Sequence, residues 1–296
     1  MSTRPVSRKP PQARYLAITP ARDEERLLPG LIASLEAQSA TPAHWILIDD
    51  GSRDGTPAIA DAAAARCPWI EVHHLDLRRE RAPGGESVIM KFLPRELWQA
   101  YDFILRLDAD LTFDSQMAEL LIAEFAKGRK LGIAGAVLYE PRGTEWREIR
   151  APRFHTHGAV KMYSSKCFTA IGGLQAGIGW DTVDEAYAMM LGFKTSTFRH
   201  IVAYHHRPQG SAGGSLSGRF GTGRTAYVIG YSPVFMVARA AARILSHPPI
   251  LGSVMLLVGY FDGYVRHLPR LAPPELVKFI RRQQIRRLLL RESRWK

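Results

Sequence analysis

The apolar run at residues 103–111 constrains the fold most strongly, because it leads directly into two aspartates one residue apart. Its apolar residues predict a buried strand with Asp108 and Asp110 at its carboxyl end. Residues i and i+2 of a strand lie on the same face, so the two carboxylates can converge on one cation. A strand followed by a solvated acidic turn would explain the same residues, so the rest of the chain has to decide.

The segments before this run alternate between predicted strands and predicted helices. Continuous apolar runs predict strands, and apolar residues that recur every three or four positions predict helices. In chain order these are a strand at 15–19, a helix at 27–35, a strand at 45–48, a helix at 57–66, a strand at 70–74 and a helix at 86–101. The alternation predicts an α/β fold with a mostly parallel sheet, flanked by helices and joined by right-handed crossovers.

Two further aspartates, Asp49 and Asp50, follow the second predicted strand and precede Gly51 and Ser52. An Asp-Gly turn that caps the next helix explains Gly51 and Ser52. It explains two adjacent aspartates less well, so we expect one to hold the turn and the other to face the ribose or base of a ligand. Ligands of such sheets bind outside the carboxyl ends of the strands, where these carboxylates fall.

The formal net charge of +12 is concentrated at the two ends of the chain. Residues 1–14 contain four basic and no acidic residues, and residues 264–296 contain ten basic and two acidic residues. We expect residues 1–14 to form a basic disordered arm. A basic end suits an anionic membrane surface or nucleic acid. The near-neutral body argues against a protein that wraps nucleic acid, so we expect no specific nucleic-acid partner.

Three observations bear on location. The two cysteines, Cys67 and Cys167, stand far apart without partners at metal spacing, which fits buried thiols in a reducing, cytoplasmic compartment. No apolar segment follows the basic N-terminus, so we expect no secretion signal. The apolar run from Ile250 to Phe261 is too short to span a bilayer.

Three segments, Pro20–Glu25, Ile48–Thr56 and Leu107–Asp110, resemble in order the motifs of family 2 glycosyltransferases. The resemblance implies a GT-A-like, Rossmann-type catalytic domain, which we place at residues 15–224. It also implies a nucleotide-sugar donor and an inverting, metal-dependent transfer of a sugar. The acceptor would be a glycan or a lipid-linked molecule, as in the synthesis of polysaccharides or glycolipids.

The resemblance also implies roles for single residues of the donor site. Asp110 would bind a divalent cation on the diphosphate, and Asp108 would bind the same cation or contact the ribose. The cation neutralises the charge that grows on the leaving diphosphate, and oxygen ligands favour Mg²⁺ or Mn²⁺. The residues expected to bind the nucleotide sugar are Thr19, Pro20, Ala21, Glu24, Asp50, Asp108 and Arg207.

The base that accepts the acceptor's proton is expected near residue 181. The family often has Glu-Asp there, and the spacing from Gly192 places Asp181 on the aspartate and Trp180 on the glutamate. Asp184 competes for the same role. A partly buried carboxylate can act as a general base. Alternatively, Asp181 caps a helix and Asp184 complements the helix dipole.

Two pairs of histidines flank this acidic segment. We expect His155 and His157 to lie on one face of a strand and to bind substrate, with a structural role as the alternative. A strand is predicted at 195–203, and the resemblance implies that a histidine after it completes the metal site. We assign that role to His206, with His205 as the alternative, because adjacent residues on a strand face opposite ways.

Two loops have compositions that suit phosphate binding or closure over a bound ligand. Residues 209–218 are rich in glycine and serine, which predicts either a lid over the bound donor or a flexible linker. Residues 81–91 match a glycine-lysine segment of the family loosely, with Arg81 or Lys91 as the positive charge.

Residues 225–296 predict a basic helical extension after the catalytic domain. Apolar residues dominate Ile250–Phe261, whereas Leu276–Leu290 mixes apolar with basic residues. We interpret the two segments as helices on an anionic membrane surface, with an ordinary helical cap on the sheet as the alternative. The protein would then be peripheral on the cytoplasmic face of the membrane.

Two other classes of function remain at this stage. A nucleotidyltransferase would need a phosphate loop rich in glycine and Lys or Arg after the first strand, but residues 20–25 are acidic. A non-catalytic protein that binds membranes or nucleic acid would explain the basic ends, but not the ordered carboxylates. We therefore predict a hexosyltransferase-type glycosyltransferase.

Overall fold

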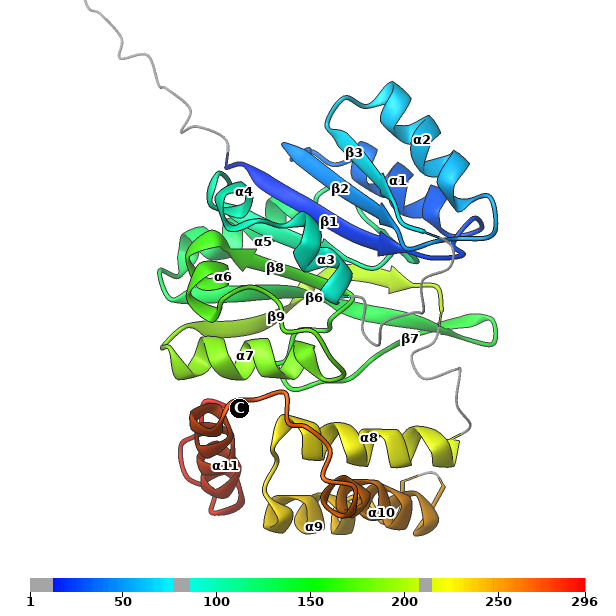
Figure 1. Cartoon of the computed structure of the whole chain (residues 1–296). Coiled ribbons are helices and arrows are strands. Elements are labelled where there is room, and N and C mark those ends of the chain that lie inside the picture. Colours follow the sequence, from blue (N-terminus) through cyan, green and yellow to red (C-terminus); the bar gives the residue numbers. More distant parts are fainter. Residues whose placement is uncertain (1–12, 77–85, 208–214, 247, 296) are drawn as a thin grey trace, which may run out of the picture.

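The computed structural model describes residues 13–76, 86–207, 215–246 and 248–295. The strands of one nine-stranded sheet follow the order β3-β2-β1-β4-β8-β6-β9-β5, and β7 pairs with β6 (Figure 1). They are β1 (Tyr15–Ala21), β2 (His44–Asp49), β3 (Ile70–His74), β4 (Phe103–Leu107), β5 (Leu111–Phe113), β6 (Leu131–Arg142), β7 (Glu145–Glu148), β8 (Val160–Ser164) and β9 (Lys194–His205). The helices are α1 (Leu28–Glu36), α2 (Thr56–Arg66), α3 (Glu86–Phe92), α4 (Arg95–Gln99), α5 (Met117–Lys127), α6 (Ser165–Ile171), α7 (Trp180–Met190), α8 (Ser215–Ile229), α9 (Pro233–Ala241), α10 (Leu251–Val265) and α11 (Pro274–Leu288).

Most strands of the sheet run in one direction. β1 is parallel to β2 and β4, β2 is parallel to β3, and β6 is parallel to β9. β8 lies between β4 and β6 and is antiparallel to both, so β6 and β9 point the same way as β1. The carboxyl ends of β1, β2, β4, β6 and β9 therefore meet at one edge of the sheet. The predicted α/β fold with flanking helices is confirmed.

Helices cover both faces of the sheet, which explains the continuous apolar runs of its central strands. Ala17 and Trp45 belong to the core on the face covered by α1, α2 and α5. Leu16 and Ile46, one position away on the same strands, belong to the core on the face covered by α3, α4, α6 and α7. This alternation has the period of two expected for a strand that is buried on both sides.

Two predicted elements are divided in the structure. The single helix predicted at 86–101 is wrong, because Pro94 separates α3 from α4 and disfavours helical backbone before it. The strand predicted at 103–111 is divided into β4 and β5, with Asp108–Asp110 in the turn between them. β4 lies beside β1 in the middle of the sheet, whereas β5 lies beside β9 at one edge of the sheet. The chain must therefore leave the sheet between β4 and β5.

Four helices, α8 to α11, form the C-terminal region. α8 begins at Ser215, so residues 215–218 are helical rather than part of a loop, and the helix continues through the predicted boundary at 224. α8 packs closely on α10, because a Cβ at Gly223 or Gly259 would collide with the backbone of the other helix. Residues 1–12 of the arm predicted at 1–14, Arg81, and residues 209–214 of the predicted lid lie outside the described residues.

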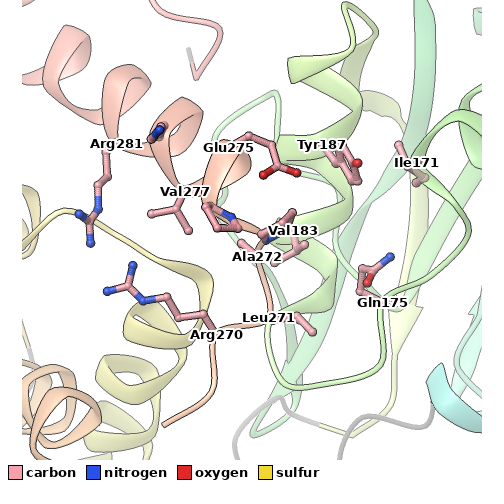
Figure 2. A pocket seen from close by; sticks show the side chains of 13 residues that line it. Ile171, Gln175, Val183, Tyr187, Arg270, Leu271, Ala272, Glu275, Val277 and Arg281 are labelled. Atoms are coloured by element: carbon pink, nitrogen blue, oxygen red, sulfur yellow. The ribbon is translucent and has the colours of Figure 1, made fainter. Parts of the chain in front are cut away.

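α11 packs on the catalytic region rather than on α10. Leu276 and Ile280 of α11 share a buried core with Val183 of α7. A cavity of about 830 Å³ lies between these helices and the segment before α11 (Figure 2). Arg281, which lines the cavity, donates from Nε to the carbonyl oxygen of Gly230 at 3.1 Å. The cavity lies at the interface between the catalytic region and the C-terminal region, and its lining includes none of the predicted donor-site residues.

None of the helices in the described part of the chain is both long and apolar enough to cross a bilayer.

Candidate active site

Asp108, Asp110 and His205 form one group at the carboxyl edge of the sheet. β5 pairs with β9, and Leu111 lies opposite His205, which brings the histidine to the turn that carries the aspartates. One ligand atom from each of the three side chains lies within 4.8 Å of the others. The two carboxylates therefore converge as their spacing suggested, although they do so from a turn and not from a strand.

Carboxylates hold the ring of His205 from both sides. Its Nε2 lies 3.2 Å from Asp110 Oδ1, and its Nδ1 lies 3.1 Å from Glu140 Oε1. Burial alone would lower the pKa of His205, but these partners raise it to about 9. Burial would raise the pKa of Asp110, but the hydrogen bond and charge of His205 lower it. A second carboxylate behind the ring is the arrangement that orients a histidine ligand.

His206 does not join this group. Its Nε2 lies 2.8 Å from Thr112 Oγ1, and its ring packs edge-on against Trp146 with the centroids 5.2 Å apart. Successive residues at the end of a strand point to opposite faces, so His206 faces away when His205 faces Asp110. Of the two histidines considered for the metal site, His206 therefore lies outside the group and His205, the alternative, lies within it.

Glu24 and Arg207 lie beside Asp110. Arg207 Nη2 donates to Glu24 Oε2, and Arg207 Nε lies 3.8 Å from Asp110 Oδ2. The Arg207 side chain is 46% exposed, whereas Glu24 is buried. Burial raises the pKa of Glu24 to about 7, against the charge of Arg207. Both residues predicted for the donor site thus lie next to the metal-binding group.

The adjacent aspartates after β2 have different roles. Asp49 Oδ1 accepts a hydrogen bond from the backbone N–H of Ser52 at 2.9 Å, so Asp49 holds the turn. The backbone N–H of Asp50 donates to the carbonyl oxygen of Ala21 at 2.8 Å. Its carboxylate lies 4.0 Å from Arg22 Nη1. Asp50 is therefore the aspartate placed at the ligand-binding edge, next to a cation.

The end of β1 supports this edge mainly through its backbone. Thr19 is fully buried, and its hydroxyl accepts a hydrogen bond from Trp45 Nε1 at 3.1 Å. Ala21 is also buried, whereas Pro20 is partly exposed. The side chain of Thr19 is therefore occupied within the core, which corrects the expectation that it contacts the donor.

Asp181 lies in the first turn of α7 and packs against Gly158. A Cβ at Gly158 would lie 3.4 Å from Asp181 Cβ and 3.1 Å from Trp180 Cζ2, so the missing side chain permits the close approach. Asp181 is half-buried. A half-buried carboxylate at a helix start can still contact a substrate, which is the first requirement of a general base.

Asp184 belongs to a buried network instead. Its Oδ1 accepts a hydrogen bond from Lys161 Nζ at 2.9 Å, and its Oδ2 accepts one from the Tyr163 hydroxyl. Lys161 also lies 3.1 Å from Glu185 Oε1. Burial raises the pKa of Asp184 to about 7, whereas that of Glu185 is lowered to about 2, because its partners outweigh burial. Asp184 is 1% exposed, so its assignment as a catalytic base is corrected to a structural role.

The histidines of the segment before β8 belong to the same interior. His155 Nδ1 lies 3.0 Å from Glu185 Oε2, and His157 is buried beside it. Burial lowers the pKa of His157 to about 4. These residues lie before β8 and not in a strand. Their contacts favour the structural alternative.

Arg106 connects the metal-binding group to α7. Its Nη1 lies 2.5 Å from Asp108 Oδ1 and donates to the carbonyl oxygen of Gly158 at 2.6 Å. Its guanidinium also lies over the ring of Trp180, 5.1 Å from the centroid. Since Gly158 touches Asp181, one chain of contacts joins the metal-binding carboxylates to the candidate base.

Sequence reasoning missed Lys161 and Arg106, although a signal was present. Each is a cation inside an apolar strand, and both are buried. Buried cations require anionic partners, so each predicts a nearby carboxylate. The partner could not be named, because it comes from another element of the fold.

The donor set of the first group suits a divalent cation. Carboxylate oxygens are ligands of Mg²⁺ and Mn²⁺, and an imidazole nitrogen is a more usual ligand of transition metals than of Mg²⁺. Asp108 remains partly exposed, with 32% of its side chain accessible, so the group is open to solvent on one side. A phosphate-bearing ligand can therefore approach it.

Comparisons with known proteins identify the family of this chain. The family model for glycosyl transferase family 2 matches residues 16–189. The polyprenol monophosphomannose synthase of Mycolicibacterium smegmatis is 31% identical over 144 residues, which are 47% of this chain and 52% of that protein. The undecaprenyl-phosphate 4-deoxy-4-formamido-L-arabinose transferase of Shewanella sediminis is 26% identical over 193 residues, 64% of this chain and 51% of that protein. The chain thus matches about half the length of these curated relatives.

A solved structure extends the similarity to the fold. The mannosyltransferase PcManGT from Pyrobaculum calidifontis, in complex with GDP-Man and Mn²⁺, aligns with a TM-score of 0.54. The alignment covers 86% of this chain and 76% of that chain at 14% identity. The family match covers more than half of this chain, and it includes the three motifs and Asp181. The chain therefore belongs to glycosyl transferase family 2 and has the GT-A fold.

Proposed function

We propose that this chain transfers a sugar, with inversion, from a nucleoside diphosphate sugar to a lipid-linked or glycan acceptor. The observation that carries this proposal is the convergence of Asp108, Asp110 and His205 at the edge where Asp50 also lies. These groups can bind the diphosphate and ribose of one donor. Family membership disfavours the nucleotidyltransferase and the non-catalytic alternatives.

The donor side of the proposal assigns a separate task to each group. Asp108, Asp110 and His205 would hold Mn²⁺ or Mg²⁺, which when bound supplies positive charge to the leaving diphosphate. Asp50 would accept hydrogen bonds from the ribose or the base. The exposed guanidinium of Arg207 lies at the same place and would donate to a phosphate oxygen.

The acceptor side of the proposal is supported by the position of Asp181. An acceptor hydroxyl would give its proton to this carboxylate while its oxygen bonds to the anomeric carbon. In the same step the bond from that carbon to the diphosphate oxygen breaks. A single displacement of this kind inverts the anomeric configuration.

The chemical class of the acceptor changes what Asp181 must do. The names of both curated relatives refer to polyprenol or its phosphate, which supports a polyprenyl phosphate as the acceptor here. A phosphate monoester is mostly ionised at neutral pH, since its second pKa is about 6. It needs no base, whereas a hydroxyl acceptor does. The basic region at 225–296 supports a peripheral position on the cytoplasmic face of the membrane.

A transfer assay would test this function. GDP-mannose, UDP-N-acetylglucosamine and dTDP-glucose would each be offered with undecaprenyl phosphate or an alkyl glucoside, with Mn²⁺, Mg²⁺ or a chelator. We expect transfer from one donor, lost with the chelator. Asp181→Asn should lower transfer to a hydroxyl acceptor by about a hundredfold or more, and to a phosphate acceptor by less. Transfer that is unchanged by the chelator and by Asp181→Asn would contradict the proposal.

A further inference from the structure

The outer face of α10 is an apolar stripe that the fold leaves uncovered. Its exposed residues recur every three or four positions along one side of the helix, and they are Leu251, Val254, Val258, Phe261 and Val265. A shallow groove of about 500 Å³ runs along the same residues. An amphipathic surface helix normally turns its apolar side to the core. Here a second apolar side faces outward.

The inner side of α10 already has its partner. Gly252, Leu256, Gly259 and Gly263 are buried and face the neighbouring helices, where the glycines allow close contact with α8. Ser253 Oγ donates to the carbonyl oxygen of Ala240 in α9 at 2.9 Å. The outward stripe is therefore not needed to hold the helices together.

α9 has an exposed apolar side as well. Val234 is 63% exposed and Val237 is 51% exposed, and the chain beyond α9 exposes Ile244 and Leu245. Figure 1 shows α9 and α10 on the side of α8 that faces away from the sheet. The apolar surface thus lies at the end of the molecule opposite the catalytic region.

The charges around this surface favour an anionic partner. Residues 215–270 contain six arginines and one aspartate. The aspartate, Asp262, is bridged by Arg224 at 2.6 Å and Arg266 at 2.9 Å. Arg243 is exposed on this side, and Arg239 and Arg219 lie close enough for their positive charges to contribute to a lowered pKa of Arg243. Three guanidinium groups therefore lie near one another.

We infer that α9 and α10 dock on an anionic lipid bilayer, with the stripe of α10 inserted into its interface. An apolar face flanked by arginines has the chemistry that binds such a surface. α11 lacks a comparable stripe, because Leu276 and Ile280 are buried against α7 and its exposed apolar residues, Ile285 and Leu288, lie at its C-terminal end. This inference rests on the proposed function for its context, since a lipid-linked acceptor would lie in the same bilayer.

Flotation with vesicles would test the inference on the full chain. Vesicles of phosphatidylcholine with about one-third phosphatidylglycerol would be compared with phosphatidylcholine alone. We expect Val258→Glu with Phe261→Glu to lower binding to the anionic vesicles by about tenfold or more. Ile285→Glu in α11 with Leu289→Glu at its C-cap adds the same charge at exposed positions and should lower this binding by less than about threefold.

Three outcomes would overturn the inference. They are binding of the wild type to neither vesicle, binding of the α10 variant equal to that of the wild type, and equal loss of binding by the α10 and α11 variants. A solution dimer that the α10 variant converts to monomer, without vesicle binding, would assign the stripe to a second copy. If the two glutamates prevent folding, Val258→Ser with Phe261→Ser replaces this variant in the same assay. Asp110→Asn should bind vesicles as the wild type does. Failure of the proposed function can therefore be distinguished from failure of membrane binding.

Discussion

Two of the acidic pairs in this chain, Asp108 with Asp110 and Asp184 with Glu185, lie in opposite environments. Asp108 and Asp110 lie at the carboxyl edge of the sheet, with Asp108 open to solvent. Asp184 and Glu185 are each 1% exposed and share Lys161 as their counter-charge. The difference teaches that the partners of a carboxylate decide its role. A carboxylate that binds a ligand must keep one side open to solvent, whereas the carboxylates of a structural pair have partners within the protein on every side.

The largest expected effect comes from removing the shared cation of the buried pair. Lys161→Met would leave the buried Asp184 without its cation and Glu185 with His155 alone, and we expect the free energy of unfolding to fall by about 3–5 kcal/mol. Urea denaturation would measure it. Lys166→Met, at an exposed position on α6, is the matched control and should change stability by less than about 0.5 kcal/mol. Equal stability of both variants would mean that the network is not structural.

Asp110 belongs to the proposed metal site, so its substitution should lower activity far more than stability. We expect Asp110→Asn to lower turnover about a thousandfold, or about 4 kcal/mol of transition-state stabilisation. The free energy of unfolding should fall by no more than about 2 kcal/mol, because the amide still accepts a hydrogen bond from His205. Initial rates and urea denaturation would check both. A variant that retains normal turnover would remove Asp110 from the site.

The pH dependence of stability should report on His157, which is buried near the Asp184 and Glu185 pair. The pKa of His157 is lowered from its ordinary value of 6.5 to about 4. Between these values the unfolded state binds a proton and the folded state does not, so stability is complete above pH 6.5 and is lost as the pH falls. We expect His157→Gln to remove about 2 kcal/mol of the stability difference between pH 7 and pH 5. Denaturation of both proteins at both pH values measures this, and identical pH profiles would contradict it.

The smallest expected effect separates the two histidines at the end of β9. His205→Gln should raise the Mn²⁺ concentration needed for half-maximal activity by about tenfold, because it removes a proposed ligand. His206→Gln, whose ring contacts Thr112 and Trp146, should change it by less than about twofold. Metal titrations of the transfer assay would measure both. A larger effect at His206 would reverse this choice between the two histidines.

The strands and the motif carboxylates could be predicted because their signals are local. β3 has the predicted bounds at 70–74, and the other early strands extend the predicted runs by a few residues. The convergence of Asp108 and Asp110 could also be predicted, because two residues apart in one chain cannot lie far from each other. Pro94 carried the signal that divides the helix predicted at 86–101, since proline limits the residue before it.

The choice between neighbours could not be predicted in the same way. His205 and His206 differ only in which side of β9 they occupy, and β5 and β6 fix that side from elsewhere in the chain. The sequence placed the base at Asp181 but left Asp184 as a competitor, whereas in the structure Lys161 and Tyr163 of β8 contact and bury Asp184. Each choice depends on a contact between distant segments.

The amino-acid sequence by itself determined the α/β order of elements, the acidic edge of the sheet and the family, because these follow from local apolar patterns and short motifs. Only the tertiary structure decided which carboxylates are open to a ligand and which are buried with a cation. It also decided that α11 packs on α7 while α10 exposes its stripe. The physical reason is that burial and charge compensation depend on partners brought together by the fold.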